Sequence, residues 1–320
     1  MAGRPRVRLL EAAEHALFDE LGLDDGARFA PALFVLGSPR TGSTLCYQLA
    51  ASVFGLPFVS NLVDELHATT PALGVIALAP RTAREPIALA SAYGKTDGPL
   101  QPSEGSAVMR NWFGGGHPSQ LVSARFLEGK REHCARTFAA VHAALGGPLV
   151  VKNAWNCFRV PELASTFPNA RFVWIRRDLL AAARSDLAAR HAYLEDPWAW
   201  SSASPANLDD LRKLHFTAQV VEAQYAYNSA IGADLAAHAA GRHAELWYED
   251  LCADPRRELE RVEVLLSGLA APDWSRTEGL ALERSERPAY APAEAAAIEE
   301  HFEAHRERLL PFRAPRLSAV

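Results

Sequence analysis

The sequence predicts an α/β fold with a P-loop-like parallel β-sheet flanked by α-helices. Continuous apolar runs at residues 32–36 and 149–151, and the segment RFVWI at 171–175, are typical of strands that are buried on both faces. Segments with helical periodicity alternate with these runs, as they do in parallel α/β sheets. The first run ends at Gly37, and residues 37–44 follow the G-x-x-x-x-G spacing of a phosphate-binding loop.

The remaining elements follow from periodicity and end signals. We expect helices at residues 8–21, 43–54, 123–145, 160–167, 179–190, 207–240, 255–269 and 293–310, and two short strands at 57–60 and 245–248. Residues 68–120 are irregular, with recurring Pro and Gly, and we interpret them as loops and short helices that form a lid or an acceptor pocket. The organisation expected is one domain over residues 1–320, with 68–120 as the acceptor-site insertion.

Composition excludes several classes of partner. The formal net charge is -5, so no global charge signal points to nucleic acid or to an anionic membrane surface. The longest apolar stretches are too short to span a bilayer, and the N-terminus has no apolar signal core. The four cysteines form no C-x-x-C pair and no zinc-like cluster with histidine. We therefore expect a cytoplasmic protein with reduced, mostly buried thiols; its oligomeric state is not readable from the sequence.

The phosphate-binding loop lacks its usual lysine. Ser43 stands where the lysine is expected, and the only cation of the loop is Arg40, whose planar guanidinium can contact an oxyanion in a bidentate manner. The hydroxyls of Thr41, Ser43 and Thr44 add donors, and the turn at Gly42 leads into a helix N-terminus whose N–H groups favour an anion. No apolar run ends in an obvious metal-binding Asp, so we expect an anion to bind without a metal.

Other polar residues follow the other two apolar runs. Lys152 ends the second run, and the pair Arg176 and Arg177 ends the third. Because ligands of parallel α/β sheets bind beyond the carboxyl ends of strands, we expect these groups to share one edge with Gly37. Arg177 is the preferred anion ligand. Arg176 is the alternative, since a shift of one residue in the strand would exchange them.

Four motifs resemble those of bacterial sulfotransferases that use 3′-phosphoadenosine 5′-phosphosulfate, and they occur in the family's order along the chain. GSPRTGSTL is similar to the 5′-phosphosulfate loop that the family writes P-R-[ST]-G-[ST]-T, and FVWIRRDLLAAARS places Ser185 eight residues after Arg177, as in the 3′-phosphate site. LVVK followed by FPNA, and YEDLCADP near the C-terminus, complete the resemblance over roughly residues 32–270. Two features depart from it: Leu179 replaces a common Pro, and no C-terminal Gly-rich, Lys-containing loop is present.

The resemblance implies a sulfotransferase fold and transfer of a sulfuryl group to a hydroxyl, or less often an amine, of a small-molecule or carbohydrate acceptor. 3′-Phosphoadenosine 5′-phosphosulfate would be the co-substrate, with no metal. Lys152 would bridge the transferring sulfuryl group. The implied donor ligands are Arg40, Thr41, Gly42, Ser43, Thr44, Arg177 and Ser185, and Arg276, Arg284 or Arg287 would replace the missing C-terminal loop.

The general base has several candidates. Many members of the family place a Glu shortly after the second strand and others use a His, and VSNLVDELH offers Asp64, Glu65 and His67. We prefer Glu65, then His67, then His117, while Asp64 or Glu65 could instead cap a helix. YED is interpreted as structural, with Tyr248 packed and the acidic residues capping a helix.

Two other functional classes remain open. A nucleotide-binding ATPase or kinase with a modified phosphate loop would bind ATP or GTP with Mg²⁺. A non-catalytic relative would bind nucleotide without turnover. For a transferase, Trp112, Trp155, Trp198 and Trp200 near the expected site loops could contact adenine or an apolar acceptor, or simply pack in the core.

Overall fold

A parallel sheet organises the chain and fixes the place of the phosphate-binding loop. In the computed structural model, which describes residues 3–91, 94–116, 124–200, 202–284 and 290–315, four parallel strands pair in the order β2-β1-β3-β4. They are β1 (Ala32–Leu36), β2 (Leu149–Lys152), β3 (Ala170–Arg176) and β4 (His243–Trp247). The strand β1, which precedes the loop, therefore lies between β2, which ends at Lys152, and β3, which precedes Arg177.

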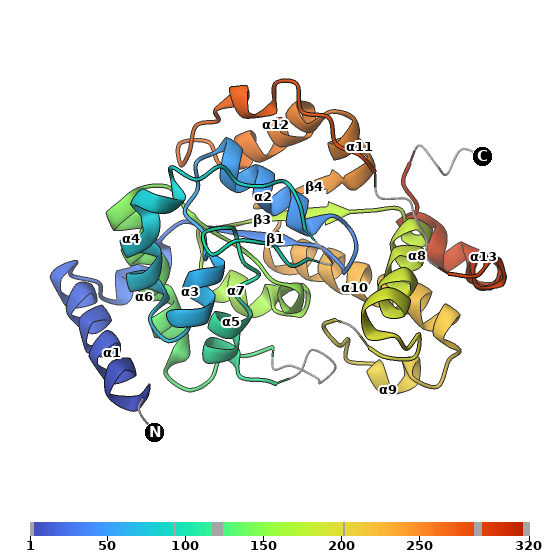
Figure 1. Cartoon of the computed structure of the whole chain (residues 1–320), viewed down its shortest axis with the longest axis horizontal. Helices are drawn as coiled ribbons and strands as arrows, with labels where there is room; N and C mark the ends of the chain where they lie inside the picture. The colour runs from blue at the N-terminus through green and yellow to red at the C-terminus, as the bar shows by residue number, and fades with distance from the viewer. Residues whose placement is uncertain (1–2, 92–93, 117–123, 201, 285–289, 316–320) are drawn as a thin grey trace.

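Helices cover both faces of this sheet (Figure 1). Phe34 and Leu36 of β1 pack on one face with α6 (Lys130–Leu145), α7 (Val160–Thr166) and α10 (Phe216–His238). Leu33 and Val35 point to the other face, where α2 (Ser43–Val53), α11 (Tyr248–Ala253) and α12 (Pro255–Leu265) cover them. This alternation follows from the two-residue repeat of a strand and makes the continuous apolar runs necessary. The predicted α/β fold is confirmed.

The other elements surround this three-layer core. They are α1 (Gly3–Glu20), η1 (Asp25–Phe29), α3 (Asn61–Leu66), α4 (Pro71–Thr82), α5 (Ser106–Phe113), η2 (Ala154–Phe158), α8 (Leu179–Ala189), the π-helical turn η3 (Arg190–Leu194), α9 (Leu208–Leu211), η4 (Trp274–Thr277), α13 (Pro292–Ala304), α14 (Arg306–Leu309) and η5 (Leu310–Phe312). Within the described ranges, no helix combines the length and the apolar character needed to cross a bilayer.

Four predicted elements differ from the structure. One is the helix expected at 293–310, which ends at Ala304 as α13 and is followed after His305 by the separate short helix α14. Residues 57–60 form only isolated bridges, Phe58 with Val150 and Ser60 with Pro102, because the side chain of Ser60 caps α3 and the chain turns away. The helix expected at 123–145 begins at Lys130, after a left-handed Gly129, and Leu127 precedes it.

The helix expected at 207–240 is two helices. The short α9 ends at Leu211, and α10 begins only at Phe216, where the side chain of His215 accepts a hydrogen bond from the N–H of Thr217. The regular apolar spacing across residues 211–218 continues through the non-helical residues between α9 and α10, so it did not reveal that the helix is interrupted.

All four cysteines are buried thiols. Burial raises the pKa of Cys46 to about 12 and that of Cys157 to about 11, so both stay protonated at neutral pH. The Sγ of Cys157 lies 3.1 Å from the carbonyl oxygen of Gly37, to which it donates. This thiol therefore supports the first residue of the phosphate-binding loop.

Candidate active site

A cavity of about 880 Å³ opens at the carboxyl edge of the sheet. The phosphate-binding loop, Lys152 after β2 and Arg177 after β3 all line it, as the positions of the strand ends predict. Its volume is typical of small-molecule and cofactor sites. The side chains that reach it define what it can bind.

Two residues give the phosphate-binding loop its shape. Gly42 has φ 79°, and a Cβ there would lie 2.3 Å from the ring of Tyr248, so a side chain at this position is excluded. Arg40 also adopts a left-handed conformation, with φ 71°, which is unusual for a residue other than glycine. Such conformations persist only where the surrounding structure holds them, and they concentrate at ligand sites.

The hydroxyl residues of the loop have two different roles. Thr41 is fully buried, and its Oγ1 donates to the carbonyl oxygen of Ser38 at 2.7 Å, so this hydroxyl shapes the loop from inside. Ser43 and Thr44 begin α2 and line the cavity. The N–H of Cys46 bonds to the carbonyl of Gly42, which leaves the three preceding N–H groups at the start of the helix for an anion.

Helix α10 holds the loop through a buried amide. The Oε1 of Gln224 accepts from the Ser38 hydroxyl at 2.6 Å, and its Nε2 donates to the carbonyl oxygen of Pro39 at 2.9 Å. Asn228, one turn later, donates to the Ser38 Oγ at 3.3 Å. Sequence reasoning missed both contacts, because no motif surrounds Gln224 or Asn228. The only signal was this pair of amides four residues apart in the helix expected at 207–240.

The two halves of the expected donor site meet beside the loop. The Nε of Arg40 donates to the Oγ of Ser185 at 3.3 Å, and the Nη1 of Arg177 donates to the carbonyl oxygen of Arg40 at 2.9 Å. Arg177 is 6% exposed, and its guanidinium lies 4.6 Å from the centroid of the Tyr248 ring. Tyr248 thus packs between Gly42 and Arg177.

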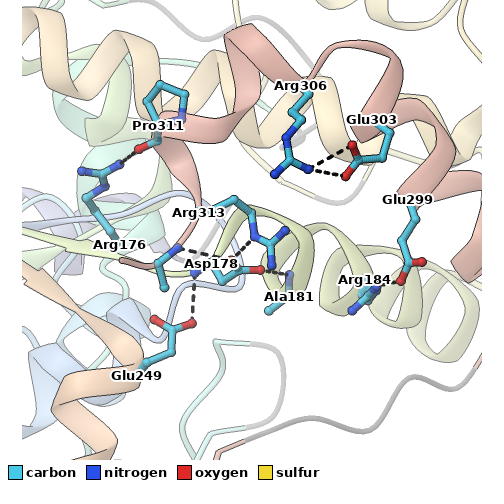
Figure 2. A network of polar contacts seen from close by, with 11 residues as sticks. Arg176, Asp178, Ala181, Arg184, Glu249, Glu299, Glu303, Arg306, Pro311 and Arg313 are labelled. Atoms are coloured by element: carbon cyan, nitrogen blue, oxygen red, sulfur yellow. Dashed lines mark hydrogen bonds and ion pairs between the residues drawn. The ribbon is translucent and has the colours of Figure 1, made fainter. Parts of the chain in front are cut away.

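The neighbouring arginine faces away from the cavity. Arg176 donates to the carbonyl oxygen of Pro311 at 2.9 Å (Figure 2). It also pairs with Glu245 at 2.5 Å and stacks over Trp247 at 4.3 Å. These contacts occupy Arg176 at the far side of β3. Of the two arginines that the sequence left open, Arg177 is the one at the cavity.

Two of the three other basic residues considered are described, and they have separate positions. Arg276 pairs with the exposed Asp273 and does not line the cavity. Arg284 donates to the carbonyl oxygen of Glu249 at 3.0 Å. Arg287 lies outside the described residues. Arg284 is therefore the candidate linked to the segment that carries Arg177, because the N–H of Asp178 donates to the side chain of the same Glu249.

A second ion pair lies at the end of β2. Lys152 is buried and pairs with Glu104, which comes from the irregular segment 68–120. A Cβ on Gly94 would lie 2.8 Å from the Oε1 of Glu104 and 3.7 Å from the Oγ1 of Thr44. The carboxylate of Glu104 is thus close to both Lys152 and the phosphate-binding loop. Sequence reasoning missed Glu104 because no motif surrounds it.

The preferred base of the sequence analysis does not reach the cavity. Glu65 is exposed on α3, whereas Asp64 lines the cavity. Successive residues of a helix point about 100° apart, so only one of the two can face inward. The Oδ1 of Asp64 accepts from the N–H groups of Ala107 and Val108 at 2.8 and 3.0 Å, and it therefore caps α5. Burial raises the pKa of Asp64.

Of the two histidine candidates, His67 also lies away from the cavity lining. The Nδ1 of His67 is 3.2 Å from the Oγ1 of Thr70, and its ring packs where a Cβ of Gly74 would be, away from the cavity lining. Burial lowers the pKa of His67. His117 lies outside the described residues.

The tryptophans divide between cavity and core. Trp155 and Trp200 line the cavity together with Leu89, Ala90 and Leu194. Trp112 is buried in the core, where its Nε1 donates to His133 at 2.9 Å, and Trp198 is exposed against Phe216. The cavity therefore has apolar and aromatic lining residues in addition to its charged ones.

One group of potential metal ligands occurs in the described part of the chain, outside this cavity. It comprises Glu222, His301 and His305. Glu222 already accepts hydrogen bonds from Arg308 at 2.9 and 2.6 Å and is 2.9 Å from the Nε2 of His301. These contacts show that the three residues link α10 to the C-terminal helices.

Together, the parallel sheet, the loop at a helix N-terminus and the cationic edge define an α/β protein with a site for an anionic ligand. Residues 31–273 match the Sulfotransferase family, and the chain belongs to this family. The structure is similar to that of sulfotransferase STF1 from Mycobacterium tuberculosis H37Rv, with 17% identity, 94% of this chain and 81% of that chain covered, and a TM-score of 0.51.

Two further solved structures are similar over most of their length. Sulfotransferase STF9 from Mycobacterium avium is 16% identical, with 92% of this chain and 80% of that chain covered and a TM-score of 0.47. The sulfotransferase from Alicyclobacillus acidocaldarius is 15% identical, with 91% and 99% covered and a TM-score of 0.41. No curated protein sequence matches this chain. The family and the STF1 comparison agree with the sulfotransferase fold predicted from the motifs.

Proposed function

We propose that this protein transfers a sulfuryl group from 3′-phosphoadenosine 5′-phosphosulfate to the hydroxyl, or less readily the amine, of a small-molecule or carbohydrate acceptor. The observation that carries the proposal is the meeting of Arg40, Ser185 and Arg177 at the mouth of a helix N-terminus. Two separated anionic groups of one nucleotide need two neighbouring cationic sites, and these residues supply them.

The loop suits the 5′-phosphosulfate. The N–H groups at the start of α2, the hydroxyls of Ser43 and Thr44, and the guanidinium of Arg40 converge on the cavity. Thr41 and Gly42 contribute by shaping the loop, as their buried contacts indicate. Arg177 and the hydroxyl of Ser185 suit the 3′-phosphate.

The proposed reaction moves one group and one proton. The acceptor oxygen attacks the sulfur, the bond between sulfur and the bridging 5′-phosphate oxygen breaks, and the electron pair stays on adenosine 3′,5′-bisphosphate. Lys152, at the end of β2, would stabilise the charge on that leaving oxygen. A positioned base takes the acceptor proton.

We assign the base to Glu104 in place of Glu65. Glu104 lines the cavity beside Lys152 and the phosphate-binding loop, where the sulfuryl group would lie, whereas Glu65 is exposed outside it. A base must come within hydrogen-bond reach of the proton it removes. Asp64 is the second candidate, because it lines the same cavity, but its capping contacts with α5 restrict it.

The acceptor is proposed to bind against the irregular segment. Leu89, Ala90 and Thr96 of that segment line the cavity together with Trp155 and Trp200. An apolar wall with aromatic rings favours a small apolar or natural-product alcohol over a long polysaccharide, which would need an extended polar track. Residues 68–120 would thus supply both the acceptor wall and the base.

The test is ligand-dependent stability. Adenosine 3′,5′-bisphosphate without Mg²⁺ should raise the melting temperature, because a ligand that binds only the folded state stabilises it. ATP with Mg²⁺ should raise it less. A larger effect of Mg²⁺-ATP, abolished by a chelator, would instead support the ATPase or kinase alternative. Bisphosphate binding without turnover across an acceptor screen would support the non-catalytic alternative.

A further inference from the structure

Both neighbours of Arg177 in the sequence contact the same C-terminal segment. We call residues 306–315 the C-terminal arm. Arg176 donates to the carbonyl oxygen of Pro311 in this arm at 2.9 Å, and Asp178 pairs with Arg313 (Figure 2). The arm lies beyond residues 31–273, the part that matches the family. Arg177 is thus held between two contacts to a segment outside the family match.

Asp178 is the central acceptor of this network. It is 2% exposed, and its Oδ1 accepts from the N–H of Ala181 at 3.1 Å, which caps the N-terminus of α8. Its Oδ2 accepts from Arg313 and, at 3.2 Å, from the N–H of Ala314. A buried carboxylate requires such partners, since leaving its charge unpaired is strongly destabilising.

The N–H of Asp178 is also bound. It donates to the Oε1 of Glu249 at 3.0 Å (Figure 2). The backbone that carries Arg177 is therefore fixed by Glu249 on one side and by the C-terminal arm on the other. Few conformations remain for the arginine between these contacts.

The arm has its own packing against the helices behind the site. Leu309 shares a buried cluster with Leu180 and Leu187 of α8 and with Ile298 and Phe302 of α13. Arg184 of α8 also pairs with Glu299 of α13 (Figure 2). The arm and α13 therefore dock on α8 as one unit, and α8 carries Ser185.

We propose that the C-terminal arm positions Arg177 and α8 for the 3′-phosphate of the donor, and that Arg313 is the positioning residue that acts through Asp178. This inference rests on the proposed function. Without Arg313, Asp178 loses its charged partner, and the start of α8 and the guanidinium of Arg177 gain freedom. The consequence falls on the 3′-phosphate, because Arg177 and Ser185 face that group, and not on the loop that holds the 5′ end.

The experiment compares two nucleotides that differ only in the 3′-phosphate. Arg313→Ala should weaken binding of adenosine 3′,5′-bisphosphate roughly 2- to 30-fold, the range for residues that act through a network, and leave 5′-AMP binding within about twofold. Arg313→Lys keeps the positive charge beside Asp178 and should recover part of the difference. Calorimetry well below the melting temperature measures both constants.

Arg306→Ala is the matched control. Arg306 belongs to the same arm, but it pairs with the exposed Glu303 and not with Asp178, so both affinities should stay at the wild-type value (Figure 2). If Arg313→Ala does not fold, Asp178→Asn replaces it, because the Asn can still cap Ala181 while losing its charge toward Arg313. The same selective loss is expected.

Two results would overturn the inference, and they are distinguishable. Wild-type protein without affinity for adenosine 3′,5′-bisphosphate would remove the proposed function and this inference together. Normal wild-type affinity, with an unchanged ratio between the two nucleotides in the Arg313 or Asp178 variant, would remove the inference alone.

Discussion

The Nε of Arg40 and the hydroxyl of Ser185 lie 3.3 Å apart and form a hydrogen bond, although 145 positions separate them in the chain. One belongs to the loop after β1 and the other to the helix after β3. Their contact joins the two anion-binding regions that the motifs indicated separately. The contribution of each region to ligand binding can therefore be tested by substituting one residue at a time.

Arg177→Ala should selectively weaken binding of the 3′-phosphate. A hydrogen bond to a charged group contributes roughly 1.5–3 kcal/mol, or about ten- to a hundredfold in affinity. Adenosine 3′,5′-bisphosphate should lose that factor, while 5′-AMP should lose little, as titration calorimetry would measure. Arg171→Ala, at the other end of β3, is the control and should change neither. Equal losses for both nucleotides would assign Arg177 to a structural role.

Glu104→Gln should abolish proton acceptance while it keeps the shape of the side chain. Turnover should fall by roughly 10²–10⁴, the usual contribution of a positioned base, with donor affinity nearly intact. Steady-state rates with any identified acceptor would show this as a loss in kcat. Glu65→Gln and His67→Ala should keep near-normal turnover, because neither side chain lines the cavity. Full activity in Glu104→Gln would shift the assignment to Asp64.

Gly42→Ala should distort the phosphate-binding loop. The new Cβ would lie 2.3 Å from the ring of Tyr248, in a backbone with φ 79°. Gly55→Ala is the matched control, since it has φ 57° but no atom within 4 Å of the added Cβ. Both variants should lose roughly 1–2 kcal/mol of stability through the left-handed backbone. Only Gly42→Ala should also lose bisphosphate affinity, by roughly tenfold or more, as the loop contacts separate. Equal affinities in the two variants would show that the loop tolerates the clash.

Glu222 should make the attachment of the C-terminal helices sensitive to acid. Burial raises its pKa, but the hydrogen bonds from His301 and Arg308 outweigh that effect and lower the pKa to about 2. A carboxyl whose pKa is lower in the folded state stabilises the fold above its ordinary value near 4.5, and this contribution is lost as the pH falls toward 2.

The check is the free energy of unfolding of wild type and Glu222→Gln at several pH values. The difference should be full at pH 7 and should shrink below about pH 4.5. Glu299→Gln is the control: Glu299 lies on the adjacent helix in a more exposed pair with Arg184, so its effect should be small throughout. A difference between wild type and Glu222→Gln that persists unchanged to pH 3 would contradict the assignment.

Much of the fold was predictable because buried parallel strands leave a strong signal. The bounds of β1 were predicted to the residue, since a run that is apolar on both faces stops abruptly at Gly37. Residues 57–60 were wrongly assigned to a strand, because a short apolar run can also lie beside a sheet with a single bridge. Helix starts were less predictable, because a capping residue such as Gly129 or His215 overrides apolar spacing.

The site was predictable where a motif carried it and not elsewhere. Arg40, Lys152 and Arg177 were placed at one edge by strand ends alone. Glu104 was missed because its segment has no period and no motif, and its position depends on contacts with Lys152 across the fold. Glu65 was preferred over Asp64 by analogy, although the orientation of a six-residue helix cannot be read from its sequence.

The buried amide of Gln224 has a consequence for the energetics of binding. It fixes Ser38 and Pro39 through side-chain contacts from α10, and Thr41 closes the turn from inside. The loop is therefore preorganised: its shape is set by the protein before any nucleotide enters. A ligand that meets a rigid loop gives up its own freedom without having to order the loop as well, which leaves more of the contact energy as affinity. Affinity at this loop then depends in part on a buried amide that does not line the cavity.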